Sequence, residues 1–81
     1  MITIYTKNSC VFCTNVKNVL SKLNLSYTEC NIDTNYTKTE LLQKYPSVKT
    51  VPVTEIDDQV FFDSKKAIEY ILDKYNGGIQ V

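Results

Sequence analysis

Apolar and polar residues follow two different periods along the first part of the chain. Residues 2–5 alternate between apolar and polar positions, which predicts a short β-strand. Farther on, apolar side chains recur at helical spacing and predict a helix over about residues 11–24, with Ser9 or Cys10 near its N-cap. Residues 25–32 are rich in β-forming side chains and predict a second strand. Because the connections are short, the two strands should be parallel and joined by a right-handed crossover.

The second half of the chain repeats these patterns after a polar loop. Thr37 and Glu40 are spaced as in a capping box, which predicts a second helix that runs to about Tyr45, directly before a proline. Residues 51–56 and 59–62 predict the two strands of a β-hairpin with a short turn between them.

A last helix is predicted near the end of the chain. Ser64 can cap it, apolar residues follow at helical spacing, and Gly77 ends it, which leaves residues 78–81 as a loose tail. The predicted order is therefore βαβαββα. It indicates an α/β fold with a four-stranded mixed sheet flanked by three helices.

Length and charge narrow the class of protein. The chain has 81 residues, 43% of them hydrophobic, and nine basic residues balance nine acidic ones. We expect one domain over residues 1–81 and no whole-chain positive field for nucleic acid. No apolar run approaches the roughly twenty residues of a membrane span, and the N-terminus does not resemble a signal peptide. We therefore expect a cytoplasmic monomer without membrane partners.

The candidate chemistry lies at Cys10 and Cys13, at the predicted start of the first helix. On a helix this spacing places the two sulfurs about one turn apart, within reach of a disulfide. A thiol in the first turn faces unpaired backbone N–H groups and the positive end of the helix dipole, which favour the thiolate. Cys10, with Lys7 nearby, is therefore the predicted exposed nucleophile, and Cys13 is the more buried resolving sulfur. The pattern indicates dithiol–disulfide exchange.

Other uses of a Cys-x-x-Cys pair fit this composition less well. Zinc needs four ligands, whereas the chain has three cysteines and no histidine. No histidine follows Cys13, which excludes the pattern for haem attachment. A structural disulfide over so short a loop would constrain the unfolded chain little. We expect no metal and no bound prosthetic group, and we predict that Cys30, in the second strand, is a small buried apolar residue.

The predicted order, with Cys-x-x-Cys on the first strand–helix turn and Val-Pro opening the third strand, resembles the thioredoxin fold in its smallest form. Residues 4–13, Ile-Tyr-Thr-Lys-Asn-Ser-Cys-Val-Phe-Cys, resemble the glutaredoxin signature, and residues 50–52 resemble its second motif. The resemblance extends from Ile2 to about Leu72. It implies a disulfide reductase that uses glutathione as its electron donor.

The resemblance also implies roles for single residues. Cys10 matches the family nucleophile and Cys13 the resolving cysteine. Lys7 matches a lysine that stabilises the thiolate and meets a carboxylate of glutathione, and Phe12 matches an aromatic residue beside the disulfide. Val51 matches the residue whose backbone pairs with the cysteinyl part of glutathione.

Further implied contacts lie at the third strand and the last helix. Pro52 matches a cis-proline that faces the site, and Asp63 and Ser64 lie where the family binds the γ-glutamyl end of glutathione. Most glutaredoxins have a Gly-Gly pair there, where this chain has Phe62 and Asp63. The bulk of Phe62 and the charge of Asp63 predict weaker use of glutathione, with the thiol chemistry intact.

Three functions fit the resemblance. The first is a glutathione-coupled oxidoreductase that reduces protein disulfides and glutathione mixed disulfides. The second is a redoxin that thioredoxin reductase reduces and that serves ribonucleotide reductase; Val11, where most glutaredoxins have proline, and the missing Gly-Gly favour it, while Phe12 favours the first. The third is an iron–sulfur carrier, disfavoured because Cys-x-x-Cys favours a disulfide over open coordination. The protein substrate is not evident from the sequence, and ribonucleotide reductase is a family expectation only.

Overall fold

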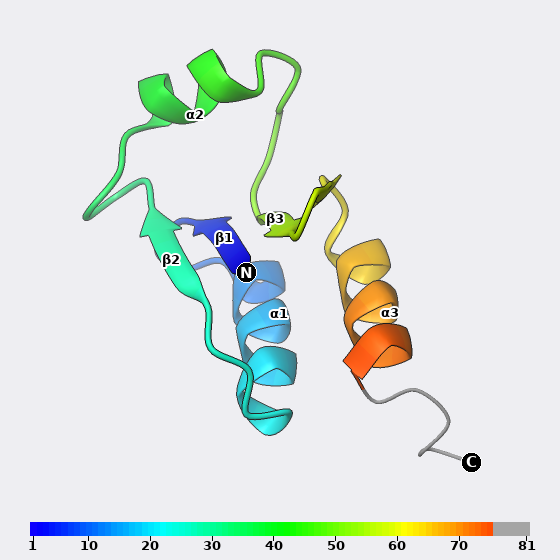
Figure 1. The fold of residues 1–81 in the computed structure, drawn as a ribbon. Helices are drawn as coiled ribbons and strands as arrows, with labels where there is room; N and C mark the ends of the chain where they lie inside the picture. The colour runs from blue at the N-terminus through cyan, green and yellow to red at the C-terminus, as the bar shows by residue number, and fades with distance from the viewer. Residues whose placement is uncertain (76–81) are drawn as a thin grey trace.

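A computed structural model describes residues 1–75, and the predicted helix stop at Gly77 and tail at 78–81 lie outside them. The order βαβαββα is confirmed (Figure 1). The elements are β1 (Ile2–Thr6), α1 (Val11–Lys22), β2 (Thr28–Asn31), α2 (Lys38–Lys44), β3 (Val53–Ile56), β4 (Gln59–Phe61) and α3 (Ser64–Tyr75). Among the described residues, no helix is long and apolar enough to cross a bilayer.

The four strands form one mixed sheet in the order β2-β1-β3-β4. β1 runs parallel to β2 and antiparallel to β3, and β3 runs antiparallel to β4. Tyr5, near the end of β1, is paired with Cys30 on one side and Val53 on the other. The central strand β1 thus ends between the two strands that flank it, and its C-terminal end leads directly to the cysteine pair.

Side chains of β1 alternate between the two faces of the sheet, so both faces carry an apolar cluster. Helices cover both of these apolar faces. Ile4 belongs to the larger cluster, which joins one face of the sheet to α1 and α3. Tyr5 belongs to the smaller one, which joins the opposite face to α2 through Leu41. Figure 1 shows α1 and α3 running alongside each other and α2 lying apart from them.

Helix α1 ends where the sequence indicates. Its buried stripe comprises Cys13, Val16 and Leu20. Asn24 has a φ of 57°, in the left-handed region, and its N–H donates to the Ser21 carbonyl. The Leu25 N–H donates to the Leu20 carbonyl, so these two hydrogen bonds satisfy helix-end carbonyls as in a Schellman motif.

Several elements are shorter than predicted. β2 begins at Thr28 rather than residue 25, because residues 25–27 leave the helix and have no partner on the short β1. β3 begins at Val53 rather than residue 51, because Pro52 has no N–H to offer the sheet. β4 ends at Phe61 and α2 at Lys44, each one residue early.

The predicted cap of the last helix was also wrong by one residue. Ser64 is the first helical residue of α3. The Asp63 carboxylate accepts a hydrogen bond from the Lys65 N–H at 2.8 Å, and the Asp63 carbonyl accepts from Ala67. Asp63 is therefore the N-cap, a position where its carboxylate also faces the positive end of the helix dipole.

Candidate active site

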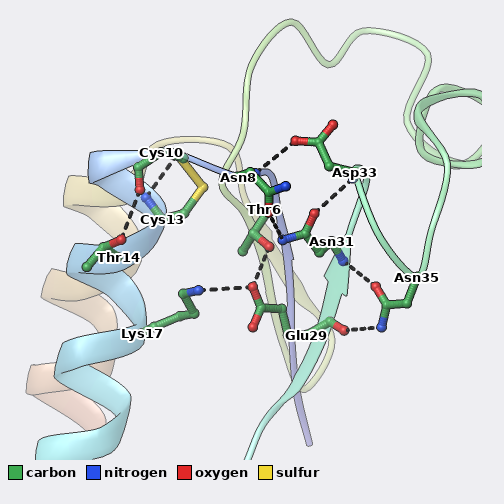
Figure 2. Close-up of polar contacts among 10 residues, drawn as sticks. All are labelled: Thr6, Asn8, Cys10, Cys13, Thr14, Lys17, Glu29, Asn31, Asp33 and Asn35. Carbon is green, nitrogen blue, oxygen red and sulfur yellow. Dashed lines mark hydrogen bonds and ion pairs between the residues drawn. A yellow bond between two sulfur atoms is a disulfide. The ribbon is translucent and has the colours of Figure 1, made fainter.

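Cys10 is the N-cap of α1, as predicted, and its sulfur lies at the first turn of the helix. The Cys13 backbone N–H points at the Cys10 sulfur at 3.1 Å, and the Cys10 carbonyl accepts from both the N–H and the hydroxyl of Thr14 (Figure 2). The sulfur thus takes the place of the oxygen in an ordinary N-cap. An N–H aimed at this atom favours its negatively charged form over the thiol.

Cys10 and Cys13 form a disulfide, with their Cα atoms 5.2 Å apart (Figure 2). Their exposure differs as predicted: Cys13 is 1% exposed, whereas Cys10 is partly open to solvent. An external thiol or disulfide can therefore reach Cys10 and not Cys13. This asymmetry suits one sulfur to attack and the other to resolve.

A polar network that we did not predict holds the loop before Cys10. The Asn8 N–H donates to the Asp33 carboxylate at 2.9 Å, and the Asn31 side chain donates to the Asn8 side chain at 3.2 Å (Figure 2). Asn35 in turn accepts from the Asn31 N–H. Ser9 next to Cys10 has a φ of 55°. The cluster of Asn and Asp over residues 31–35 was the available sequence signal, since such residues favour turns.

The segment that leads into β3 supplies the opposite wall of the site. The Val51–Pro52 peptide bond is cis, as predicted, and the Val51 carbonyl oxygen lies 3.9 Å from the Cys10 sulfur. Pro52 is buried and Val51 is half-buried. The backbone of Val51 is thus placed beside any group that is bonded to Cys10.

Most of the predicted contact residues share one hollow beside the disulfide. It is lined by Phe12, Thr50, Val51, Pro52, Phe62, Asp63, Ser64 and Lys65. Phe12 is 61% exposed, so its ring is available to a substrate. Lys7 lines a different hollow that shares Thr50 and Val51 with the first. The six positions predicted beside the cysteines therefore divide between two adjoining hollows.

Phe62 and Asp63 are both engaged within the fold. The Phe62 ring packs edge-on against Tyr45, with centroids 5.5 Å apart. The Asp63 carboxylate caps α3, as described above. The bulk and the negative charge predicted at the γ-glutamyl end are thus held in place by neighbouring elements.

A second unpredicted network lies on the side of the sheet that faces α1. The Thr6 hydroxyl, which is fully buried, donates to the Glu29 carboxylate at 2.6 Å, and the Lys17 ammonium donates to the same oxygen at 3.0 Å (Figure 2). The Thr6 hydrogen bond lowers the pKa of Glu29 most; partial burial opposes it, and Lys17 adds to the lowering. The network joins β1, β2 and α1 behind the disulfide.

A third network joins α2 to the opposite face of the sheet. The Glu55 carboxylate accepts from the Tyr5 hydroxyl at 3.0 Å and from the Tyr45 hydroxyl, and pairs with Lys44 at 2.8 Å. Burial and the hydrogen bond to Glu55 raise the pKa of Tyr45 to about 12. Burial of Glu55 opposes its ionisation, but the donors outweigh it and hold its pKa below the usual range.

Cys30 is half-buried, so its predicted full burial was wrong. It packs against the smaller cluster, beside Tyr5 in the sheet. Burial raises the pKa of the Cys30 thiol, with a further contribution from Glu55. At neutral pH Cys30 is therefore a poor nucleophile. Residues 1–75 contain no group of three or more Cys, Asp or Glu side chains placed to hold a metal.

These observations define a class of protein before any relative is considered. It has a dithiol site at a helix N-terminus, facing a cis-proline just before β3, on a small mixed sheet with helices on both faces.

Comparison with known proteins specifies the family. The Glutaredoxin family profile matches residues 2–61. Glutaredoxin 3 of Escherichia coli is 40% identical over 58 residues, which cover 72% of this chain and 70% of that protein. The chain belongs to the glutaredoxin family, and it is a thiol–disulfide oxidoreductase with a thioredoxin-like fold.

Solved structures show the same fold in two other settings. NrdH-redoxin of Escherichia coli, a glutaredoxin-like protein with a thioredoxin-like activity profile, aligns with a TM-score of 0.66 and 26% identity over 84% of this chain and 91% of that one. Glutathione transferase E6 of Drosophila melanogaster aligns with a TM-score of 0.73 and 32% identity, covering 93% of this chain and 35% of the transferase. The chain thus spans about a third of the transferase.

Proposed function

We propose that this protein is a glutathione-coupled oxidoreductase that reduces protein disulfides and glutathione mixed disulfides through Cys10 and Cys13. One observation carries the proposal: the Cys10 sulfur lies between the Cys13 N–H at 3.1 Å and the Val51 carbonyl at 3.9 Å, at the open end of α1. The N–H stabilises a thiolate, and the Val51 carbonyl can accept a hydrogen bond from the backbone of a bound thiol compound.

The cycle conserves electrons without a bound cofactor. The Cys10 thiolate attacks a substrate disulfide, forms a mixed disulfide and releases one substrate thiolate. Cys13 then loses its proton and attacks Cys10, which releases the second thiolate and leaves the Cys10–Cys13 disulfide. Two glutathione molecules restore the dithiol and leave as one glutathione disulfide. With a glutathione mixed disulfide, glutathione can resolve the Cys10 adduct directly, without Cys13.

We propose that glutathione lies across the two adjoining hollows. Its cysteinyl sulfur bonds to Cys10 while its backbone lies along Val51 and Pro52. Its glycine carboxylate is then directed to Lys7, and its γ-glutamyl end to Phe12, Asp63 and Ser64. Likeness to glutathione transferase E6, which by its name acts on glutathione, supports this assignment. Phe62, in place of a glycine, narrows the γ-glutamyl end and should raise the KM for glutathione.

The second candidate is a redoxin that receives electrons from thioredoxin reductase. Its supporting observation is the pair Phe62 and Asp63, which fill the γ-glutamyl end with a ring and a capping carboxylate. The structural likeness to NrdH-redoxin supports it as well. In either case we place the protein in the cytoplasm as a monomer, where cellular thiols keep the dithiol reduced. Ribonucleotide reductase is a candidate protein substrate.

An electron-donor assay separates the two candidates. Reduction of a protein disulfide is followed with glutathione, glutathione reductase and NADPH, and in parallel with thioredoxin reductase and NADPH. Turnover with the glutathione system supports the first candidate, and turnover with thioredoxin reductase alone supports the second. The Cys10→Ser variant provides the background rate. If the chemically reduced protein also fails to reduce the disulfide in a single turnover, both candidates fall.

A further inference from the structure

The hollow that contains Lys7 is here called the basic groove. Its volume is about 180 Å³. Its lining combines cationic and aliphatic side chains from the loop before Cys10, the segment after β2, helix α2 and the segment before β3. The residues are Lys7, Ile32, Lys38, Leu41, Leu42, Val48, Lys49, Thr50 and Val51.

Three lysines surround the basic groove. Lys7, Lys38 and Lys49 are all exposed, and within residues 1–75 none of them takes part in an ion pair. Asp33 accepts from the Asn8 N–H and Glu40 from the Thr37 hydroxyl, and neither forms an ion pair with these lysines. The lining contains three lysines and no carboxylate, so the groove presents positive charge on a chain whose net charge is zero.

Between the lysines the groove is aliphatic. Leu41 is 2% exposed and anchors α2 to the sheet, whereas Leu42 on the same helix is 37% exposed. Ile32 and Val48 are half-buried on either side. A ligand with carboxylates alone would leave the aliphatic part of the groove exposed to water. The lining therefore suits a ligand that carries an aliphatic side chain as well as negative charge.

The basic groove is continuous with the redox site. Thr50 and Val51 line both the basic groove and the hollow beside Phe12. The Val51 carbonyl is the group that lies 3.9 Å from the Cys10 sulfur. A chain bonded to Cys10 through a disulfide and extended along Val51 would therefore enter the groove within a few residues, at about 3.3 Å per residue.

We propose that the basic groove binds an acidic, extended segment of the protein substrate, adjacent to the cysteine that bonds to Cys10. One aliphatic side chain of the segment packs between Leu42 and Val48, and flanking carboxylates pair with Lys38 and Lys49. Glutathione offers a glycine carboxylate to Lys7 but has no aliphatic side chain, so this part of the groove distinguishes protein substrates from glutathione. The inference rests on the proposed disulfide exchange with protein substrates.

Synthetic peptides with an internal disulfide test the inference without any electron donor. Three peptides of equal length are compared: one with leucine flanked by two aspartates near the reactive cysteine, one with the aspartates replaced by lysines, and one with the leucine replaced by glycine. Each is made with the leucine on either side of the cysteine. Reduced protein is mixed with peptide, and the second-order rate constant for formation of the Cys10–Cys13 disulfide and the peptide dithiol is measured.

We expect the acidic peptide to react about tenfold faster than the basic one at low salt, because opposite charges accelerate encounter. This ratio should approach one at 0.5 M salt, where screening is nearly complete over a few ångströms. Replacing leucine by glycine should slow the acidic peptide about fivefold through lost apolar burial. The double variant Lys38→Glu, Lys49→Glu should remove or reverse the preference, and Leu42→Ser should remove the leucine effect.

Lys22→Glu is the control for position, since it makes the same Lys→Glu change at a single site at the far end of α1 and should leave the ratio unchanged. If the double glutamate variant is misfolded by circular dichroism, Lys38→Gln, Lys49→Gln replaces it and should bring the ratio close to one. Equal rate constants for acidic and basic peptides in both leucine placements, or a ratio unaffected by the groove variants, would overturn the inference. Failure to reduce any peptide would instead overturn the proposed function.

Discussion

At Cys10, backbone and side chain act together. The extended backbone of an N-cap, with φ of −111° and ψ of 108°, turns the sulfur toward the N–H groups of the first turn. Cys13 has a helical backbone one turn farther on and is buried beneath it. Two chemically identical side chains are thereby suited to different roles by their position on one helix, because exposure and N–H donors differ between them.

The roles of the two cysteines can be tested separately. Cys10→Ser should abolish exchange with every disulfide, because Cys30 is half-buried and its raised pKa keeps it protonated. Cys13→Ser should retain activity on glutathione mixed disulfides and lose reduction of protein disulfides. Both are measured by NADPH consumption in the glutathione-coupled assay. Activity in Cys10→Ser together with none in Cys13→Ser would reverse the assignment.

Glu29 should contribute stability that depends on pH. Thr6 and Lys17 lower the pKa of Glu29 in the folded protein. The stability that Glu29 contributes is therefore complete above the carboxyl pKa of the unfolded chain, about 4.3. This contribution to stability is lost as the pH falls through the lower pKa that Glu29 has in the folded state. Glu29→Gln should cost about 1 kcal/mol at pH 7 and flatten the loss of stability below about pH 5. Urea unfolding between pH 3 and 7 measures both effects.

Glu69→Gln is the matched control for this change, since Glu69 is an exposed carboxylate on α3. It should leave the pH profile of unfolding nearly unchanged. Identical acid sensitivity in wild type and Glu29→Gln would show that the hydrogen bonds to Glu29 do not stabilise the folded state.

At the scale of elements, the start of α3 combines structural contacts with the lining of the proposed glutathione site. Asp63 caps the helix, and Phe62 joins the end of the hairpin to Tyr45 on the α2 side. Both residues also line the hollow beside Phe12. A change made there to improve glutathione binding therefore also affects the connection between elements.

Separate substitutions resolve these two roles. Phe62→Gly should lower the KM for glutathione by opening the γ-glutamyl end, and should reduce stability through lost packing and added unfolded-state entropy. Asp63→Asn removes the charge and keeps the cap, whereas Asp63→Ala removes both and should cost about 1 kcal/mol more. Steady-state kinetics and thermal unfolding measure the two effects. An unchanged or higher KM in folded Phe62→Gly would contradict this account of the site.

For the whole molecule, stability depends on one sheet covered by helices on both faces. The larger apolar cluster lies under α1 and α3, and two buried threonines, Thr6 on β1 and Thr54 on β3, lie on the same face of the sheet as Ile4. Thr6 donates to Glu29, whereas the Thr54 hydroxyl has no hydrogen-bond partner among residues 1–75. The Thr6 hydroxyl should therefore stabilise the fold, whereas the Thr54 hydroxyl on the same face should destabilise it.

Replacement of each threonine by valine should reveal this difference. Thr54→Val removes a buried hydroxyl without a partner and should stabilise the fold by about 1 kcal/mol. Thr6→Val removes a donor to a carboxylate and should destabilise it by about 1–3 kcal/mol. Denaturant unfolding at neutral pH gives both values. Equal destabilisation by the two substitutions would mean that the Thr54 hydroxyl is satisfied in solution.

Local sequence was sufficient to predict the elements and the redox pair. The period of apolar residues gave their order, and a short-range capping group gave the start of the second helix at Thr37, although the last helix is capped by Asp63 rather than Ser64. These signals act over a few residues, so no knowledge of distant contacts is needed to interpret them. The errors occurred where a neighbouring element decides, as at the start of β2, which depends on the length of β1, and at Cys30, whose burial depends on what α2 covers.

The groups that other elements bring to the cysteines were positioned by the tertiary structure. The Val51 carbonyl faces Cys10 from 41 residues away, Asp33 holds the Asn8 N–H from 25 away, and Glu29 meets Thr6 from 23 away. The basic groove likewise combines lysines from a loop, a helix and a strand connection. No local period or cap encodes such pairs, because their proximity follows from strand order and crossover path. The chain sequence therefore specified the reactive atoms, and the fold specified which groups surround them.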